Sequence, residues 1–140
     1  MAVQHNLLAI DVGERRVGVA IANSLARLSS PLTTLINNDN LHELIKELVE
    51  KNNITELVIG LPRNLNGYDT KQTEYVRNFS KQLENLNLPI YLEDEALSSV
   101  RAKDMLEKSK KNYSKADVDS QAACYILDDF MLNHSEVINV

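Results

Sequence analysis

The stretch LLAIDVGERRVGVAIA, residues 7–22, decides the expected fold. Two apolar runs flank a short turn that contains Gly13, a pattern typical of a β-hairpin. In the second run, valine and isoleucine alternate with glycine and alanine, so one face of this strand is bulky and the other is small. Asp11 ends the first run, where a charge beside core residues costs free energy unless it has a partner. Asp11 therefore either stabilises the turn by hydrogen bonds or faces something positively charged.

The rest of the chain predicts strands that alternate with helices. A third strand is expected around residues 32–36, and Pro31 leaves its start undefined. This order predicts an α/β fold with a mixed five-stranded sheet: an antiparallel meander, then parallel strands, all flanked by helices in one domain spanning residues 1–140. Active sites of such sheets lie beyond the carboxyl ends of the parallel strands. The later elements are expected as a helix over 40–53, a strand over 56–62, a helix over 70–86, a strand after Pro89, a helix from Ser98 or Ser99 to about Lys108, and a helix from about Ser114 to Leu132.

The composition is that of a globular protein. Of the 140 residues, 44% are hydrophobic and 25% are charged. No apolar run reaches the roughly 20 residues that a membrane helix needs, and the first residues lack the features of a signal peptide. The single cysteine, Cys124, fits a reducing compartment, so we expect a cytoplasmic protein. The last segment, HSEVINV, is expected to be mobile.

Two further groups of acids stand where acids are unexpected. On a helix, the neighbours of Asp119 at the spacing of one face are apolar, so Asp119 is expected to face the core, whereas Asp117 suits a helix cap or solvent. The acidic run over residues 93–95 ends a strand and is either a solvated loop or part of a site. If Asp11, Glu95 and Asp119 converge, their oxygens suit Mg²⁺ or Mn²⁺. The histidines, which lie outside these motifs, are expected on the surface: His5, His42 and His134.

A basic segment offsets the acidic balance of the chain. The formal net charge is -5, but residues 101–115 hold six basic and two acidic residues. That segment carries +4 and leaves -9 for the rest of the chain. It can contact phosphates, or it is a solvated helix end and loop.

Four segments resemble the YqgF family, whose members are described as pre-16S rRNA nucleases or as Holliday-junction-resolvase-like proteins. The matching segments are IDVGERRVGVAIA (10–22), VIGLPRNLNG (58–67), EDEALSSVRA (93–102) and DVDSQAACYIL (117–127). The resemblance implies a compact ribonuclease H-like fold with Asp11, Glu95 and Asp119 as a catalytic, metal-binding triad. Further matches are Arg16 and Gly18 in the first motif and Gly60, Pro62, Asn64 and Gly67 in the second.

The chain departs from the family pattern after the acidic pair of the third motif. The family usually has arginine there, and this chain has Ala96. The loss removes a planar, bidentate phosphate donor, which affects the grip on substrate more than metal binding. Arg101 lies one helical turn further on and is a candidate replacement.

The leading hypothesis is therefore a nuclease that uses Mg²⁺ or Mn²⁺ and trims the 5′ end of a 16S rRNA precursor. Its partner would be nucleic acid rather than a membrane, and it would be a monomer or a weak homodimer. The expected substrate-binding residues are Arg15, Arg16, Asn64, Ser98, Ser99, Arg101, Lys110 and Lys111.

Three other functions remain open from the sequence. One is resolution of four-way DNA junctions, which requires two active sites and hence a dimer. Another is a non-catalytic RNA or ribosome-assembly module, which Ala96 favours. The last, nucleotide hydrolysis of the actin-like kind, needs two such domains and ranks lowest.

Overall fold

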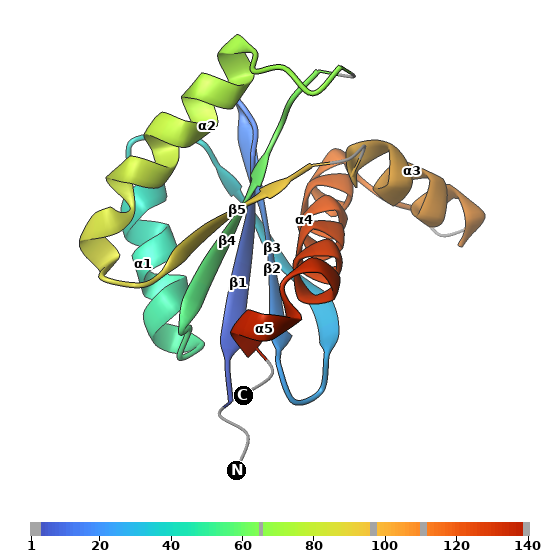
Figure 1. The fold of residues 1–140 in the computed structure, drawn as a ribbon. Helices are drawn as coiled ribbons and strands as arrows, with labels where there is room; N and C mark the ends of the chain where they lie inside the picture. The colour runs from blue at the N-terminus through green and yellow to red at the C-terminus, as the bar shows by residue number, and fades with distance from the viewer. Residues whose placement is uncertain (1–3, 65, 96–97, 110–111, 139–140) are drawn as a thin grey trace.

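The computed structural model describes residues 4–64, 66–95, 98–109 and 112–138, without the side chains of residues 98–101 and 138. Strands and helices follow one another in the expected order (Figure 1). The elements are β1 (Asn6–Val12), β2 (Arg16–Asn23), β3 (Leu28–Ile36), α1 (Leu41–Lys51), β4 (Glu56–Leu61), α2 (Lys71–Gln82), the 3₁₀ helix η1 (Glu84–Leu86), β5 (Ile90–Asp94), α3 (Ser98–Lys108), α4 (Lys115–Asn133) and α5 (Ser135–Ile138).

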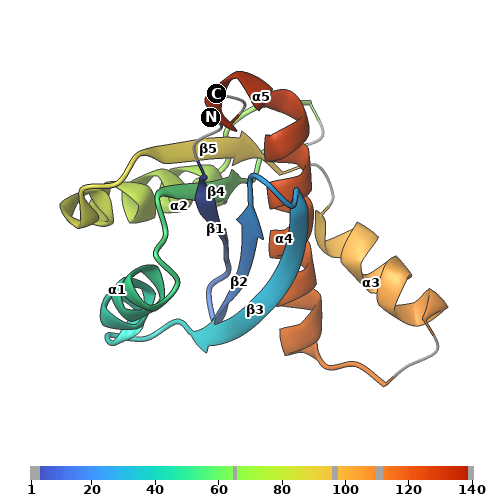
Figure 2. The ribbon, with the colours of Figure 1, turned by 90° about the horizontal axis from the view of Figure 1, so that it is seen from below.

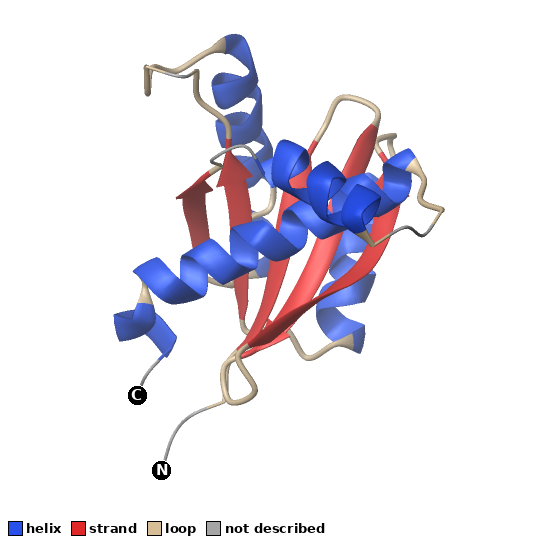
Figure 3. Cartoon of the chain, turned by 90° about the vertical axis from the view of Figure 1, so that its right-hand side faces the viewer, coloured by secondary structure: helices blue, strands red, loops and turns tan. Residues whose placement is uncertain are grey.

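The five strands form one mixed sheet in the order β3-β2-β1-β4-β5. β1 pairs antiparallel with β2, and β2 pairs antiparallel with β3, which gives the expected meander. β4 pairs parallel with β1 and with β5. Helices α1 and α2 cover one face, and α4 crosses the other face (Figures 1 and 3). Because α4 contacts all five strands, residues from the whole sheet meet under this one helix.

The third strand begins earlier than the expected start at residue 32. β3 runs from Leu28 and includes Pro31, which has no N–H group to donate. The proline is tolerated because β3 is an edge strand, and because the register with β2 shifts between Val19 and Ala20, where Ala20 faces Pro31.

The alternation of side chains divides the core between the two faces of the sheet. The face toward α1 and α2 carries large residues, among them Leu8, Ile10, Val17, Val19, Leu57 and Ile59. The face toward α4 carries smaller ones on the strands, among them Ala9, Ala20 and Ala22, which pack against Ile126, Leu127 and Phe130 of the helix. The expected bulky and small faces of β2 are thus confirmed.

Local signals fix the beginning of α4. Ser114 and Asp117 form a capping box, in which each side chain accepts a hydrogen bond from the backbone of the other. The expected role of Asp117 as a cap is therefore confirmed. Helix α3 packs against α4 and projects from the sheet layers, as Figure 2 shows from below.

The end of the chain differs from the expectation of mobility. Residues 135–138 form the short helix α5, and Val137 packs against the core under α4, while residues 139–140 lie outside the described structure. Across the described ranges, no helix has both the length and the apolar character needed to cross a membrane.

Candidate active site

The three acids predicted as a triad meet on the face of the sheet that α4 covers. Asp11 lies near the end of β1 and is paired in register with Gly18 of β2. Glu95 directly follows β5, where its backbone N–H donates to the carbonyl of Leu61 at 3.0 Å. Asp119 comes from the beginning of the second turn of α4. The site thus lies at the carboxyl ends of the parallel strands.

Two glycines let these carboxylates approach one another. A Cβ atom on Gly18 would overlap the backbone carbonyl of Asp119, so this glycine allows α4 to lie directly on β2. A Cβ atom on Gly60 would lie 2.5 Å from Cδ1 of Ile126 and 3.3 Å from Oε2 of Glu95. The small face of the sheet is therefore what makes room for the acids.

The carboxyl groups of Asp11 and Glu95 lie close enough for a hydrogen bond when one of them is protonated. Burial raises the pKa of Asp11 well above its ordinary value, and the charges of Glu95 and Asp119 raise it further. Burial also raises the pKa of Glu95, while the hydrogen bond from Asp11 lowers it in part. The two neighbouring carboxyl groups therefore bind a proton more readily than isolated acids do, and a bound cation would displace such a proton into solvent.

Asp119 has a different partner. The Nε–H group of Arg16 donates to Oδ2 of Asp119 at 2.6 Å, and the two side chains are 35% and 21% exposed. This short, charge-assisted bond joins the first residue of β2 to α4, 103 positions later. Arg16 thus neutralises one acid of the site.

The donor chemistry fits a hard divalent cation. Asp11 and Glu95 offer carboxylate oxygens, the ligands that Mg²⁺ and Mn²⁺ prefer. In the described part of the chain, no three acidic, histidine or cysteine side chains are arranged to enclose an ion together. The residues therefore fit a cation as a pair of carboxylates, with the third acid held by Arg16.

The turn after Asp11 is held by groups that the sequence did not single out. The Gly13 N–H donates to the Arg16 carbonyl at 3.0 Å. Asn37 Nδ2 donates to the carbonyl of Gly13 at 2.8 Å, and Gln72 Nε2 donates to that of Val12 at 3.2 Å. Because backbone groups, the residue after β3 and α2 hold this turn, the Asp11 carboxyl is left to face Glu95. Single side-chain amides that meet across the fold leave no pattern in the sequence.

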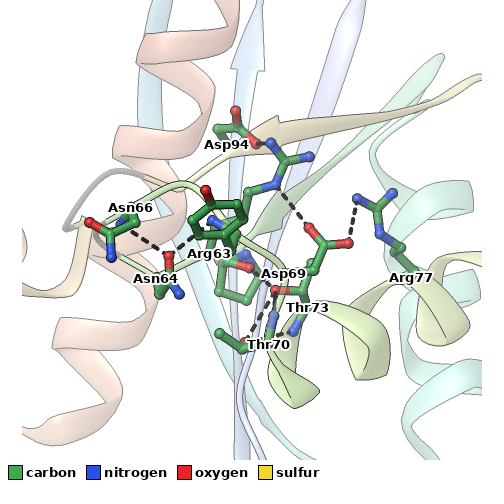
Figure 4. Close-up of polar contacts among 10 residues, drawn as sticks. Arg63, Asn64, Asn66, Asp69, Thr70, Thr73, Arg77 and Asp94 are labelled. Carbon is green, nitrogen blue, oxygen red and sulfur yellow. Dashed lines mark hydrogen bonds and ion pairs between the residues drawn. The ribbon is translucent and has the colours of Figure 1, made fainter.

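Asn64 lies in the loop between β4 and α2 and shapes that loop. Its Oδ1 accepts hydrogen bonds from the backbone N–H groups of Asn66 at 3.0 Å and Tyr68 at 2.9 Å (Figure 4). Beside it, Asp69 bridges Arg63 and Arg77 at 3.4 and 3.3 Å. These contacts connect the described residues of the loop next to the end of β4.

The structure describes the other expected substrate-binding residues only in part. Arg15 is exposed in the turn between β1 and β2. The backbone of Ser98, Ser99 and Arg101 belongs to α3, but their side chains lie outside the described structure, as do Ala96, Lys110 and Lys111 entirely. Within the basic segment, Lys103, Lys108 and Lys115 are exposed.

Two of the three histidines expected on the surface instead pair with buried glutamates. His134 Nε2 lies 3.0 Å from Oε2 of Glu93, and His5 Nδ1 lies 2.6 Å from Oε1 of Glu56. Glu93 and Glu56 are only 5% and 7% exposed, so each needs such a partner. The sequence contained a signal for Glu93: side chains alternate along a strand, so Glu93 lies on the same face as Glu95, toward α4.

Comparison with known proteins is consistent with this arrangement. A family model described as "RuvX: Holliday junction resolvase" matches residues 5–133. A Chloroflexus aurantiacus protein named "Putative pre-16S rRNA nuclease" is 38% identical over 130 residues, covering 89% of this chain and 85% of that protein. A Mycoplasma mobile protein of the same name is 39% identical over 132 residues, covering 91% and 92%.

A solved structure supports the fold. T. thermophilus RuvC in complex with Holliday junction substrate matches with a TM-score of 0.55 and 11% identity, over 92% of this chain and 95% of that one. The expected ribonuclease H-like fold is thereby confirmed. With the family model matching nearly the whole chain, the chain belongs to the RuvX family, the YqgF family whose motifs the sequence carries.

Proposed function

We propose that this protein is a divalent-metal-dependent nuclease that hydrolyses phosphodiester bonds in the 5′ region of a 16S rRNA precursor. The observation that carries the proposal is the Asp11–Glu95 carboxyl pair, placed beside Asp119 at the carboxyl ends of the parallel strands. Two partly buried carboxyl groups this close together are costly when both are ionised, unless a cation offsets their charge. The names of the curated relatives favour precursor rRNA as the substrate.

Each acid and its neighbours would have a distinct task. Asp11 and Glu95 would hold Mg²⁺ or Mn²⁺, and Asp119, held by Arg16, would lie beside them as the third acid of the site. When bound, such a cation supplies the Lewis acidity that activates water and offsets charge on the phosphate. Burial under α4 limits the water around Asp11 and strengthens its interactions with charged groups.

Substrate would be held by the basic groups around the acids. Arg15 is exposed next to the site, and Lys103 and Lys108 are exposed on α3. These side chains, together with Arg16, Arg101, Lys110 and Lys111, would contact phosphates. Asn64 would act by fixing the loop over residues 62–70, and Ser98 and Ser99 by lying at the start of α3. We further expect action in the cytoplasm, where the free Cys124 stays reduced.

The test is cleavage by wild type and Asp11→Asn in parallel, with and without Mg²⁺ or Mn²⁺. The substrates are a 5′ fragment of precursor 16S rRNA and a synthetic four-way DNA junction. We expect metal-dependent cutting of the RNA and a loss of at least about 100-fold in the variant. Glu47→Gln is the matched control, because Glu47 is exposed on α1, on the other face of the sheet. Equal cleavage by wild type and Asp11→Asn would refute the proposed site.

Junction resolution is the second candidate, favoured by the description of the family model. It requires two active sites, so selective cutting of the DNA junction by a protein that sediments as a dimer would establish it. Binding of both substrates without cutting would instead favour a non-catalytic module, as Ala96 suggests.

A further inference from the structure

The bond between Arg16 and Asp119 bears on how many metal ions the site can take. Arg16 Nε and Asp119 Oδ2 are 2.6 Å apart, a distance typical of a strong, charge-assisted hydrogen bond. Both side chains are partly buried, so the pair is less screened by solvent than a surface ion pair.

The backbone holds this pair in place. Arg16 and Gly18 are two positions apart on β2, so both face α4. The absence of a side chain at Gly18 lets the Asp119 backbone lie directly on the strand. The contact therefore follows from the packing of α4 rather than from a flexible arginine on the surface.

Charge balance then limits what else the site can hold. Asp11, Glu95 and Asp119 carry three negative charges when ionised, and Arg16 supplies one positive charge. A single divalent cation supplies the other two, so that the site is neutral. A second divalent cation would leave two excess positive charges beside the partly buried Arg16 guanidinium, which is unfavourable where solvent screening is reduced.

We infer that Arg16 is a positioning residue that holds Asp119 in place of a second metal ion, so that the free protein binds one divalent cation, through Asp11 and Glu95. The inference rests on the proposed function, since it assumes that these acids bind a metal. It narrows that function to a site with one cation and one arginine. The bond uses Nε and Oδ2, so the two Nη groups of Arg16 stay available to donate to a substrate phosphate.

Mn²⁺ binding to the full-length protein without nucleic acid tests this inference. Titration calorimetry gives the number of bound ions, and electron paramagnetic resonance detects coupling between two neighbouring Mn²⁺ ions. We expect one ion and no coupling in wild type. Arg16→Ala should take up a second ion with a coupled spectrum, because Asp119 becomes free and the positive charge is gone.

Arg15→Ala is the matched control. It removes the same charge from the adjacent, exposed residue without touching Asp119, and should still bind one ion. Arg16→Lys keeps the charge and should also bind one ion. In Asp119→Asn we expect the affinity of the single ion to fall by less than about tenfold, the low end of effects from residues beyond the ligands.

The outcomes separate the inference from the proposed function. Two ions in wild type, or the same stoichiometry in Arg16→Ala and Arg15→Ala, would overturn the inference even if the protein cleaves RNA. Loss of folding in Arg16→Ala leaves the wild-type ion count and the Asp119→Asn affinity as tests. No Mn²⁺ binding and no cleavage would overturn both.

Discussion

The two faces of the sheet differ in what their residues do. Toward α1 and α2, the strands present leucine, isoleucine and valine, whose burial stabilises the fold. Toward α4, they present alanine and glycine beside Leu7 and Val58, and at one end the charged residues Asp11 and Arg16. The small residues on this face bury less apolar area, but they let α4 come close enough to place Asp119 at the site. Stability and the site are therefore assigned largely to opposite faces of one sheet.

The largest effect is expected where α4 lies closest to the sheet. In Gly18→Ala the new methyl group would overlap the backbone of Asp119, and a backbone cannot rotate away as a side chain can. We expect a loss of about 3 kcal/mol or more in the free energy of unfolding, measured by urea denaturation.

Gly67→Ala is the control for Gly18→Ala. Gly67 has a φ of 79° in an exposed turn, with no atom within 4 Å of an added Cβ, so only backbone strain of about 1 kcal/mol is expected. If Gly18→Ala cost no more than Gly67→Ala, the proposed role of close helix packing would be wrong.

Neighbouring residues of β4 allow the two faces to be compared at one point. Ile59 faces α1 and α2, and Ile59→Ala should cost about 3 kcal/mol by leaving a cavity. Gly60 faces α4, and Gly60→Ala should cost about 1–2 kcal/mol by overpacking against Ile126. Adding Ile126→Val, which removes the crowding Cδ1 atom, should recover part of the second loss and none of the first.

Double-mutant cycles measure that difference. Recovery of at least half of the Gly60→Ala loss supports the overpacked face. If the stability losses of Ile126→Val and of its partner substitution simply added, both with Gly60→Ala and with Ile59→Ala, the two faces would not differ in this way.

The sequence predicted much of this division between the two faces, because side chains alternate along a strand and large and small residues follow that alternation. Alternation on β2 and the apolar stripe that follows Asp119 on α4 correctly assigned which residues face the core. The acids were found because they interrupt these patterns. The partners of the acids could not be found in the same way. Arg16 is as plausible a phosphate ligand as a partner of Asp119 until the distance between them is known.

Local rules also failed where tertiary context overrides them. Pro31 argues against a strand, but an edge position beside a bulge removes the need for its N–H group. His134 reads as a tail residue, yet the buried Glu93 needs a partner, which it finds there and in Asn133.

The smallest expected effect is a gain in stability, and it comes from the site itself. Asp11→Asn should raise the melting temperature at neutral pH by about 3 °C, because it removes a charge that burial disfavours and keeps a hydrogen bond to Glu95. The native state raises the pKa of Asp11, so it binds the proton more tightly than the unfolded state does. Wild-type stability therefore falls as the pH rises from the ordinary carboxyl pKa to the raised one.

Calorimetric melting of both proteins across that pH range checks this sign. The difference between Asp11→Asn and wild type should vanish near pH 3, below the ordinary value of 3.8, where Asp11 is protonated in both states. Asp119→Asn is the matched comparison: it should lose about 1 kcal/mol, because Arg16 loses its charged partner. A destabilised Asp11→Asn would mean that Asp11 already has a compensating cation in the free protein. If the two substitutions changed the stability in opposite directions, Arg16 would compensate the charge of Asp119, whereas the charge of Asp11 would have no compensating cation in the free protein.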